Sequence, residues 1–285
     1  MQMLEKIAKG TGLFVSDAAS LLKVALLSRR GRKAAPVTPD RELIIMGNGP
    51  SLRQTLDTRM PLLKNRETMA VNFAANAPEF RELSPDHYIL ADPHFFDATE
   101  SDPNVRRLWE HLRGVEKPMT LHVPAGRLDQ AKRLAESSKL TLSTFNLTPL
   151  EGHGALCRLL MRRGLGMPRP RNVLIAAIMV ALNMGYGRLY LVGADHSWSR
   201  TLSVDDKNRV LSVQPHFYSD NPAELDRVAA EYAGYHLHDI LGSLTVAFRS
   251  YFAIKDYAAS RGQEILNATP GSMIDAFERQ PLPER

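Results

Sequence analysis

The sequence predicts an α/β protein with a Rossmann-like, largely parallel sheet flanked by helices, a lid insertion and an N-terminal amphipathic helix. Three observations support this fold class. Short apolar runs alternate with helical segments along most of the chain, which is typical of parallel βαβ units. Glycines and short polar residues follow several of these runs, as they do at strand ends. A polar stretch rich in aromatic residues and histidines interrupts the alternation between residues 196 and 239.

The alternation gives the expected elements in chain order, each from the length and periodicity of its apolar residues. The expected strands are residues 43–46, 68–71, 86–90, 119–123, 140–145, 188–192 and 264–268. The expected helices are residues 51–63, 105–112, 127–137, 173–183, 240–260 and 273–279. Residues 146–171, rich in Gly, Pro and Arg, give no clear element.

The composition is that of an ordinary globular chain, with 285 residues of which 44% are hydrophobic and 24% charged. Its one cysteine, Cys157, excludes an internal disulfide and a multi-cysteine metal site. No run of about 18 apolar residues predicts a spanning helix, and a cytoplasmic protein is expected. Residues 1–36 hold seven Lys or Arg and two Asp or Glu, whereas the other residues hold 29 of each. A nucleic-acid-binding surface spread over the fold is therefore not expected.

The first 36 residues are expected to form a basic amphipathic segment and linker, and residues 37–285 the main domain. Apolar residues of the stretch 1–27 fit one helical face in parts, with interruptions at Gly10 and Gly12, and Arg29–Lys33 follow as a basic cluster. Such a segment, taken as residues 1–33, lies either on an anionic membrane surface or against the domain or a second subunit. Residues 34–40, which include two prolines, are expected to link it to the domain.

The turn after the first strand is the strongest candidate for a binding site. Gly47, Asn48 and Gly49 follow the apolar run, and Pro50 and Ser51 suit the first turn of a helix. The glycines allow close backbone approach, and a helix N-terminus offers free N–H groups and a positive dipole end. This turn therefore predicts a phosphate-binding site.

Polar residues at other strand ends extend this candidate site. Asn72, Asp92 and Asp195 each follow an expected strand, and ligands of open parallel sheets bind outside the carboxyl ends of the strands. The polar stretch 196–239 is expected to form a mobile lid over the site. Asp92 with His94 and Asp195 with His196 lack convincing metal-ligand spacing, so no metal site is expected.

Several motifs resemble those of bacterial CMP-sialic-acid-dependent sialyltransferases of the lipooligosaccharide type. They are GNGPSL at residues 47–52, AAIMVALNMGYGRLYLVGAD at 176–195, Asn72 after its strand, and the strand–Ser–helix at 267–277. The chain is also similar to surface-polysaccharide proteins related to the pterin diphosphokinase-like fold. That similarity lies in GADHSW at 193–198, VDDKN at 204–208 and HFY at 216–218.

The resemblance implies a metal-independent glycosyltransferase that needs no bound cofactor and uses a CMP-type nucleotide-sugar donor. It implies that residues 37–285 form one nucleotide-sugar transferase domain whose lid is about residues 196–239. It implies that Asn48 and Asn72 contact the nucleotide and its phosphate, that Gly271 and Ser272 hold the base or ribose, and that a lid tyrosine binds phosphate. Tyr218 is the candidate for that tyrosine, and His216 or His238 is the candidate general base.

The first hypothesis is therefore transfer of a sialic-acid-like or Kdo-like sugar to a cell-surface glycan or lipid-linked acceptor at the inner face of the cytoplasmic membrane. One alternative is an ATP- and Mg²⁺-dependent pterin-type diphosphokinase-like enzyme, with Asp92 and Asp195 as metal ligands. The other is a non-catalytic protein of a polysaccharide gene cluster. A homo-oligomer is compatible with each of the three.

Overall fold

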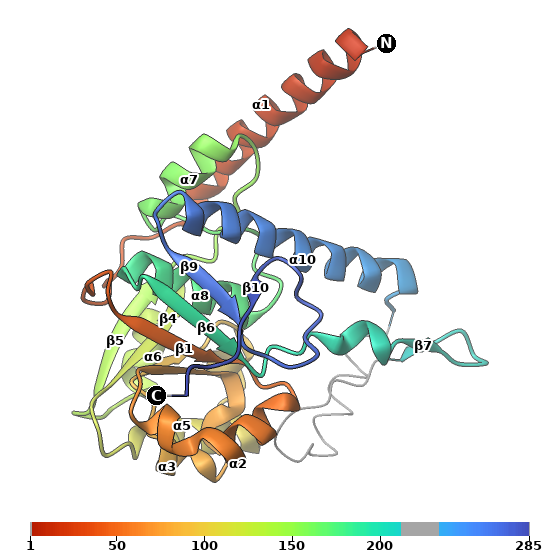
Figure 1. The fold of residues 1–285 in the computed structure, drawn as a ribbon. Coiled ribbons are helices and arrows are strands. Elements are labelled where there is room, and N and C mark those ends of the chain that lie inside the picture. The colour runs from red at the N-terminus through yellow and green to blue at the C-terminus, as the bar shows by residue number, and fades with distance from the viewer. Residues whose placement is uncertain (1, 212–233, 285) are drawn as a thin grey trace.

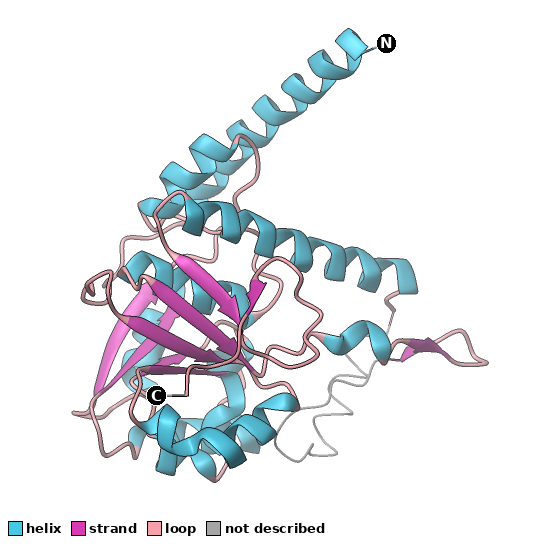
Figure 2. Ribbon diagram, in the orientation of Figure 1, coloured by secondary structure: helices cyan, strands magenta, loops and turns pink. Residues whose placement is uncertain are grey.

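A computed structural model of the chain describes residues 2–211 and 234–284. Its centre is an eight-stranded sheet with the strand order β10-β9-β6-β1-β2-β3-β4-β5 (Figure 1). Every pair of neighbouring strands in this sheet is parallel. Helices cover both faces of the sheet (Figure 2). The predicted α/β, Rossmann-like fold class is confirmed.

The strands of this sheet are β1 (Glu42–Met46), β2 (Thr68–Val71), β3 (His87–Ile89), β4 (Met119–Pro124), β5 (Leu140–Phe145), β6 (Arg188–Val192), β9 (Glu264–Asn267) and β10 (Glu278–Arg279). A separate antiparallel pair is β7 (Ser203–Val204) and β8 (Val210–Leu211). The α-helices are α1 (Gln2–Leu27), α2 (Ser51–Lys64), α3 (Glu79–Leu83), α4 (His94–Asp97), α5 (Pro103–Arg113), α6 (Leu128–Leu134), α7 (Gly154–Arg162), α8 (Val173–Met184) and α10 (Leu237–Ala259). Short 3₁₀ turns are η1 (Asn72–Asn76), η2 (Ala125–Arg127) and η3 (Ser197–Arg200).

The sheet separates two hydrophobic cores, and β1 contributes to both. Leu43 and Ile45 pack in the core that contains α8 and part of α10. Ile44 and Met46 pack in the other core, with α2, α3 and α5. Successive side chains of a strand point to opposite faces, so a central strand with helices on both sides must be apolar throughout. This is why the run at residues 43–46 has no polar alternation.

The seven expected strands are all present, with ends that differ by no more than one residue. Residues 273–279 were expected to be helical, and this expectation is wrong: the segment is an irregular loop that bends at residues 276–277 and ends in β10. Nδ2 of Asn267 donates to the carbonyl of Ile274 at 3.1 Å, and Ile274 and Phe277 are buried. The Phe277 ring also packs against that of Tyr251 with centroids 5.7 Å apart, and these tertiary contacts override the local preference for a helix.

Two further differences concern helices. Gly10 and Gly12 do not interrupt α1, which is one continuous helix that projects from the domain (Figure 1). Helix α7 forms inside the stretch for which no element was expected. Among the described residues, no helix is both long enough and apolar enough to cross a bilayer.

The described part of the expected lid comprises residues 196–211 and 234–239. It includes η3 and the β7–β8 hairpin, and its last residues belong to α10, which begins at Leu237. The helix begins there because His236 and Asp239 form a capping box: the side chain of each accepts a hydrogen bond from the main-chain N–H of the other.

Candidate functional site

The strand order places a topological switch point between β1 and β6. From β1 the chain adds β2, β3, β4 and β5 on one side, then crosses to add β6, β9 and β10 on the other. The last residues of β1 and β6, Met46 and Val192, are paired in register. The loops that leave these two strands therefore begin side by side, where open α/β sheets bind ligands.

The two loops at the switch point are in direct contact. The main-chain N–H of Gly47 donates to the carbonyl of Val192 at 2.8 Å, and that of Gly49 donates to the carbonyl of Gly193 at 2.9 Å. A Cβ atom on Gly47 would lie 2.5 Å from the Gly193 oxygen. Both loops need glycine for this approach. Because these N–H groups already have acceptors, the amides of Gly47 and Gly49 are not open donors for a phosphate in this structure.

A carboxylate of the protein itself lies at the N-terminus of α2. Oδ2 of Asp195 accepts a hydrogen bond from the Ser51 hydroxyl at 2.7 Å, and its Oδ1 accepts from the Ser51 N–H at 3.3 Å. A negative charge is stabilised at this end of a helix. Asp195 thus occupies the position that the sequence assigned to a phosphate, and it joins the β6 loop to the first turn of α2.

Asn48 and Asn72 provide the unpaired polar atoms of this edge. Nδ2 of Asn48 donates to the carbonyl of Val71, the residue before Asn72, at 3.1 Å. The Oδ1 atoms of Asn48 and Asn72 are both buried and have no hydrogen-bond partner in residues 2–211 and 234–284. Among the residues that the structure describes, none accepts a hydrogen bond from the main-chain N–H of Asn48.

The backbone at Asn72 is held in an uncommon conformation. Its φ is +50°, in the left-handed region that asparagine tolerates better than most residues. The Tyr88 hydroxyl donates to the Asn72 carbonyl and accepts from the N–H of Ala75 at 2.9 Å. These bonds fix the turn that follows β2. An unpaired buried polar atom costs free energy, so a fixed one is a candidate ligand contact.

The other predicted binding residues follow strands of the same sheet edge, and two of them, Ser272 and Asp92, have partners within the protein. The Ser272 hydroxyl is buried, donates to the Ala194 carbonyl at 2.7 Å and accepts from the Ile274 N–H at 3.2 Å. Gly271 is exposed with φ +67°. Asp92 is exposed, and its Oδ1 accepts from the N–H of His94 at 2.8 Å, in the first turn of α4.

After the end of β6, the structure brings together His196, Tyr251 and Asn172, a cluster that the sequence does not predict. Nε2 of His196 lies 2.5 Å from the Tyr251 hydroxyl, which donates to Oδ1 of Asn172 at 3.1 Å. Trp198 packs on the His196 ring with centroids 4.2 Å apart. Burial lowers the pKa of His196 to about 3 and raises the pKa of Tyr251. His196 is therefore neutral at physiological pH.

A sequence signal for His196 exists only in part. It directly follows Gly193-Ala194-Asp195, and its φ of +52° is rare for a residue other than glycine. Tyr251 and Asn172 are 55 and 79 residues away from their partners in the chain. Only the packing of α10 and α8 beside β6 brings the three side chains together.

Two of the three predicted catalytic or lid residues, His216 and Tyr218, lie outside the described residues. His238 lies in the first turn of α10 and is exposed, with its Nε2 3.3 Å from Oδ1 of Asp239. Its ring stacks on that of His236 with centroids 5.8 Å apart. Within the described residues, no hydrogen bond or ring contact links His238 to Asn48 or Asn72.

Among the described residues, no three His, Cys, Asp or Glu side chains converge as a metal site would require.

No protein-family model and no curated protein sequence matches the chain. Among solved structures, the chain is similar to the MAf glycosyltransferase from Magnetospirillum magneticum AMB-1, with 12% identity and a TM-score of 0.49 over 94% of this chain. The chain spans 38% of the length of that protein.

Proposed function

We propose that this protein is a glycosyltransferase that moves a sugar, sialic-acid-like or Kdo-like, from a CMP-type nucleotide donor to a cell-surface glycan. The observation that carries the proposal is the pair of buried, unpartnered Oδ1 atoms of Asn48 and Asn72 at the ends of adjacent central strands. These oxygens accept hydrogen bonds. A nucleoside offers matching donors in its ribose hydroxyls and, in cytosine, an exocyclic amine.

The phosphate of the donor needs hydrogen-bond donors near the same two side chains. In this proposal the main-chain N–H of Asn48 supplies one, in place of the Gly47 and Gly49 amides that bind carbonyl groups. Tyr218 remains the proposed second contact. Asp195, already bonded to Ser51, keeps the β6 loop and α2 in place and does not touch the phosphate.

The transfer itself requires a base for the acceptor hydroxyl. In this proposal a histidine of segment 196–239 takes the proton as the hydroxyl attacks the anomeric carbon, and the bond from that carbon to the phosphate oxygen breaks to release CMP. His216 is the first candidate and His238 the second. His196 is excluded from this role, because its ring is buried and bonded to Tyr251 and its pKa is about 3.

Thermal unfolding with CMP, UDP, GDP and ATP, each with and without Mg²⁺, tests the donor class. We expect CMP to raise the melting temperature without metal, since a ligand that binds only the folded state stabilises it. A shift that requires ATP and Mg²⁺ would instead indicate a diphosphokinase-like enzyme. No shift with any nucleotide would indicate a non-catalytic protein.

Asn76 provides a matched control for the two proposed contacts. Its Oδ1 is also buried and unpartnered and its Nδ2 also donates to a main-chain carbonyl, but it lies four residues beyond Asn72, at the end of η1. We expect Asn48→Ala and Asn72→Gly to abolish the CMP shift and Asn76→Ala to keep it. Equal loss in all three variants would refute the assignment of the site.

Turnover measurements on His216→Ala and His238→Ala test the base. Loss of a general base lowers the rate by roughly a hundredfold or more. We expect this loss in one of the two variants, with the CMP-induced thermal shift retained in both. Near-normal rates in both variants would show that neither histidine is the base.

A further inference from the structure

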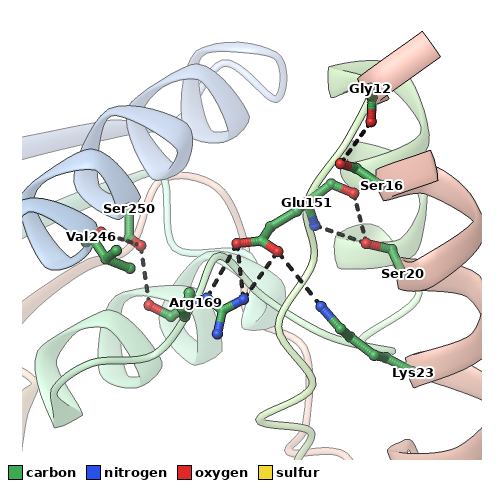
Figure 3. A network of polar contacts seen from close by, with 8 residues as sticks. All are labelled: Gly12, Ser16, Ser20, Lys23, Glu151, Arg169, Val246 and Ser250. Carbon is green, nitrogen blue, oxygen red and sulfur yellow. Dashed lines mark hydrogen bonds and ion pairs between the residues drawn. The ribbon is translucent and has the colours of Figure 1, made fainter. Parts of the chain in front are cut away.

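The side of α1 that faces the domain is held by polar contacts and by Val24, which packs against the hydrophobic core. The Ser20 hydroxyl is buried, donates to the carbonyl of Glu151 at 2.6 Å and accepts from the N–H of the same residue at 2.9 Å. Figure 3 shows these bonds, together with the ion pairs that link Lys23 to Glu151 at 3.5 Å and Glu151 to Arg169 at 3.0 Å. About one helical turn before Ser20, Oδ1 of Asp17 accepts a hydrogen bond from the main-chain N–H of His153 at 2.7 Å.

These contacts fix the rotation of the helix about its own axis. Oδ2 of Asp17 also lies 2.6 Å from Nδ1 of His153, so His153 contacts both carboxylate oxygens of Asp17. Gly152 allows this approach, because a Cβ atom there would lie 2.1 Å from Oδ1 of Asp17. Asp17, Ser20 and Lys23 recur at intervals of three residues and share one helical face. The opposite face must therefore point away from the domain.

The outward face of α1 is apolar. Its large side chains are exposed to solvent: Phe14 70%, Val15 66%, Leu21 48%, Leu22 60% and Leu26 72%. Phe14 lies at the border of this face, where its ring contacts that of His153 with centroids 5.2 Å apart. An amphipathic helix normally buries such a face against its own domain. Here the side that carries Asp17, Ser20 and Lys23 is docked instead, and a contiguous apolar surface on the other side indicates an interaction site.

A basic segment is fixed at the domain end of this apolar face. Residues 29–33 run along the edge strand β5: the N–H of Thr144 donates to the Arg32 carbonyl at 2.7 Å, and the N–H of Arg29 donates to Oδ1 of Asn146 at 2.9 Å. Gly31 is needed for this contact, since a Cβ atom there would lie 1.9 Å from the Thr144 hydroxyl. The backbone is thus held while the side chains stay exposed.

Within the described part of the chain, the cations of this segment have no counterion. Arg29, Arg30, Arg32 and Lys33 are exposed, and within residues 12–211 and 234–284 no carboxylate pairs with any of them. The same segment accounts for most of the formal net charge of +5, since residues 37–285 sum to zero. Two copies of the chain packed through this face would bring like charges together, which is unfavourable. An anionic surface would be attracted.

We propose that the outward face of α1, with the basic segment Arg29–Lys33, docks on an anionic phospholipid surface. The helix lies in the plane of the interface, its leucines enter the acyl boundary, and the arginines contact the lipid phosphates. The polar contacts of Ser20 and Asp17 keep the domain attached to the helix on the water side. This inference does not depend on the nature of the reaction at the sheet edge.

Vesicle sedimentation with the full chain tests the proposal. The probes are vesicles of phosphatidylcholine alone and vesicles of about two thirds phosphatidylcholine and one third phosphatidylglycerol. We expect binding to the anionic vesicles, weakened by salt. Leu22→Glu should lower the partition coefficient at least about tenfold. Replacing Arg29, Arg30 and Arg32 with Gln should lower it about a hundredfold on anionic vesicles.

Leu211→Glu is the matched control, because Leu211 is 42% exposed on the β7–β8 hairpin, which projects elsewhere from the domain (Figure 1). It should bind like the unmodified chain. Circular dichroism checks the fold, and Glu suits a helix nearly as well as Leu. Absent binding to anionic vesicles, or equal binding by Leu22→Glu, overturns the proposal. A dimer in sedimentation velocity that Leu22→Glu dissociates also overturns it, by assigning this face to a second copy.

Discussion

The two sides of β1 at the carboxyl edge of the sheet differ in how their polar groups are used. On the β6 side, residues 47–51 and 192–195 bond to each other through the Gly47 and Gly49 amides and through Ser51 and Asp195. On the β2 side, the side-chain oxygens of Asn48 and Asn72 have no hydrogen-bond partner among the residues that the structure describes. A glycine-rich turn therefore does not by itself provide open donors for a ligand. The amides of such a turn can bind a ligand only where they do not already donate hydrogen bonds to a neighbouring loop.

The largest expected effect tests whether the β6 side is a structural contact. Gly47→Ala should lower the free energy of unfolding by about 3 kcal/mol, because the new Cβ atom meets main-chain atoms that cannot move aside. Urea unfolding measures the change. Gly242→Ala is the control, because that glycine lies inside α10 and an added Cβ atom would meet no other atom within 4 Å. This substitution should raise the free energy of unfolding by about 0.5–1 kcal/mol. Similar effects at both sites would argue against the close contact.

The second effect concerns pH and the buried ring of His196. Its pKa is about 3 in the folded protein against 6.5 ordinarily. As the pH falls below 6.5, the His196 ring binds a proton in the unfolded chain but not in the folded protein. The free energy of unfolding therefore falls by about 1.4 kcal/mol per pH unit for this residue. His196→Asn keeps a residue that tolerates positive φ and should remove that slope.

Urea unfolding between about pH 7 and pH 4.5 measures the two slopes. His87, whose pKa burial lowers to about 4, stays in both proteins and contributes equally to both curves. The difference between the curves therefore isolates His196. Parallel curves would mean that its ring is not shielded from water in the folded state.

A smaller effect measures the bond between the β6 loop and α2. Ser51→Ala and Asp195→Ala should each cost about 1 kcal/mol, the usual value of a helix-capping contact. In the double variant the losses should not add, with a coupling energy of about 1 kcal/mol from urea unfolding. Additive losses would show that the two side chains act independently, and Asp195 would then be free to meet a ligand.

The smallest effect tests the β2 side. Asn72→Gly should change stability by no more than about 0.5 kcal/mol, because glycine adopts φ +50° without strain and the lost amide oxygen has no partner. The same substitution in Asn267, whose amide donates to Ile274 and accepts from Thr269, should cost about 2 kcal/mol or more. A large loss at Asn72, measured by urea unfolding, would indicate a structural role there too.

The sequence by itself determined the fold class and the positions of the central strands. Apolar runs such as residues 43–46 and 188–192 are local signals, and a segment of that composition is stable only when buried on both faces. Alternation with helices then requires parallel pairing and sends every strand end to one edge. The sequence could therefore locate Gly47, Asn72 and Asp195 on a common edge before any contact was known.

Only the tertiary structure decided which groups remain available for binding. The Gly47 amide, the Asp195 carboxylate and the His196 ring find partners more than 50 residues away, and no local pattern encodes such pairs. The same holds for α1. Its sequence is compatible with an apolar face packed on the domain, but the contacts of Ser20 with Glu151 and of Asp17 with His153 turn that face outward. Secondary structure follows from neighbours in the chain, whereas the satisfaction of a polar group depends on whatever packs against it.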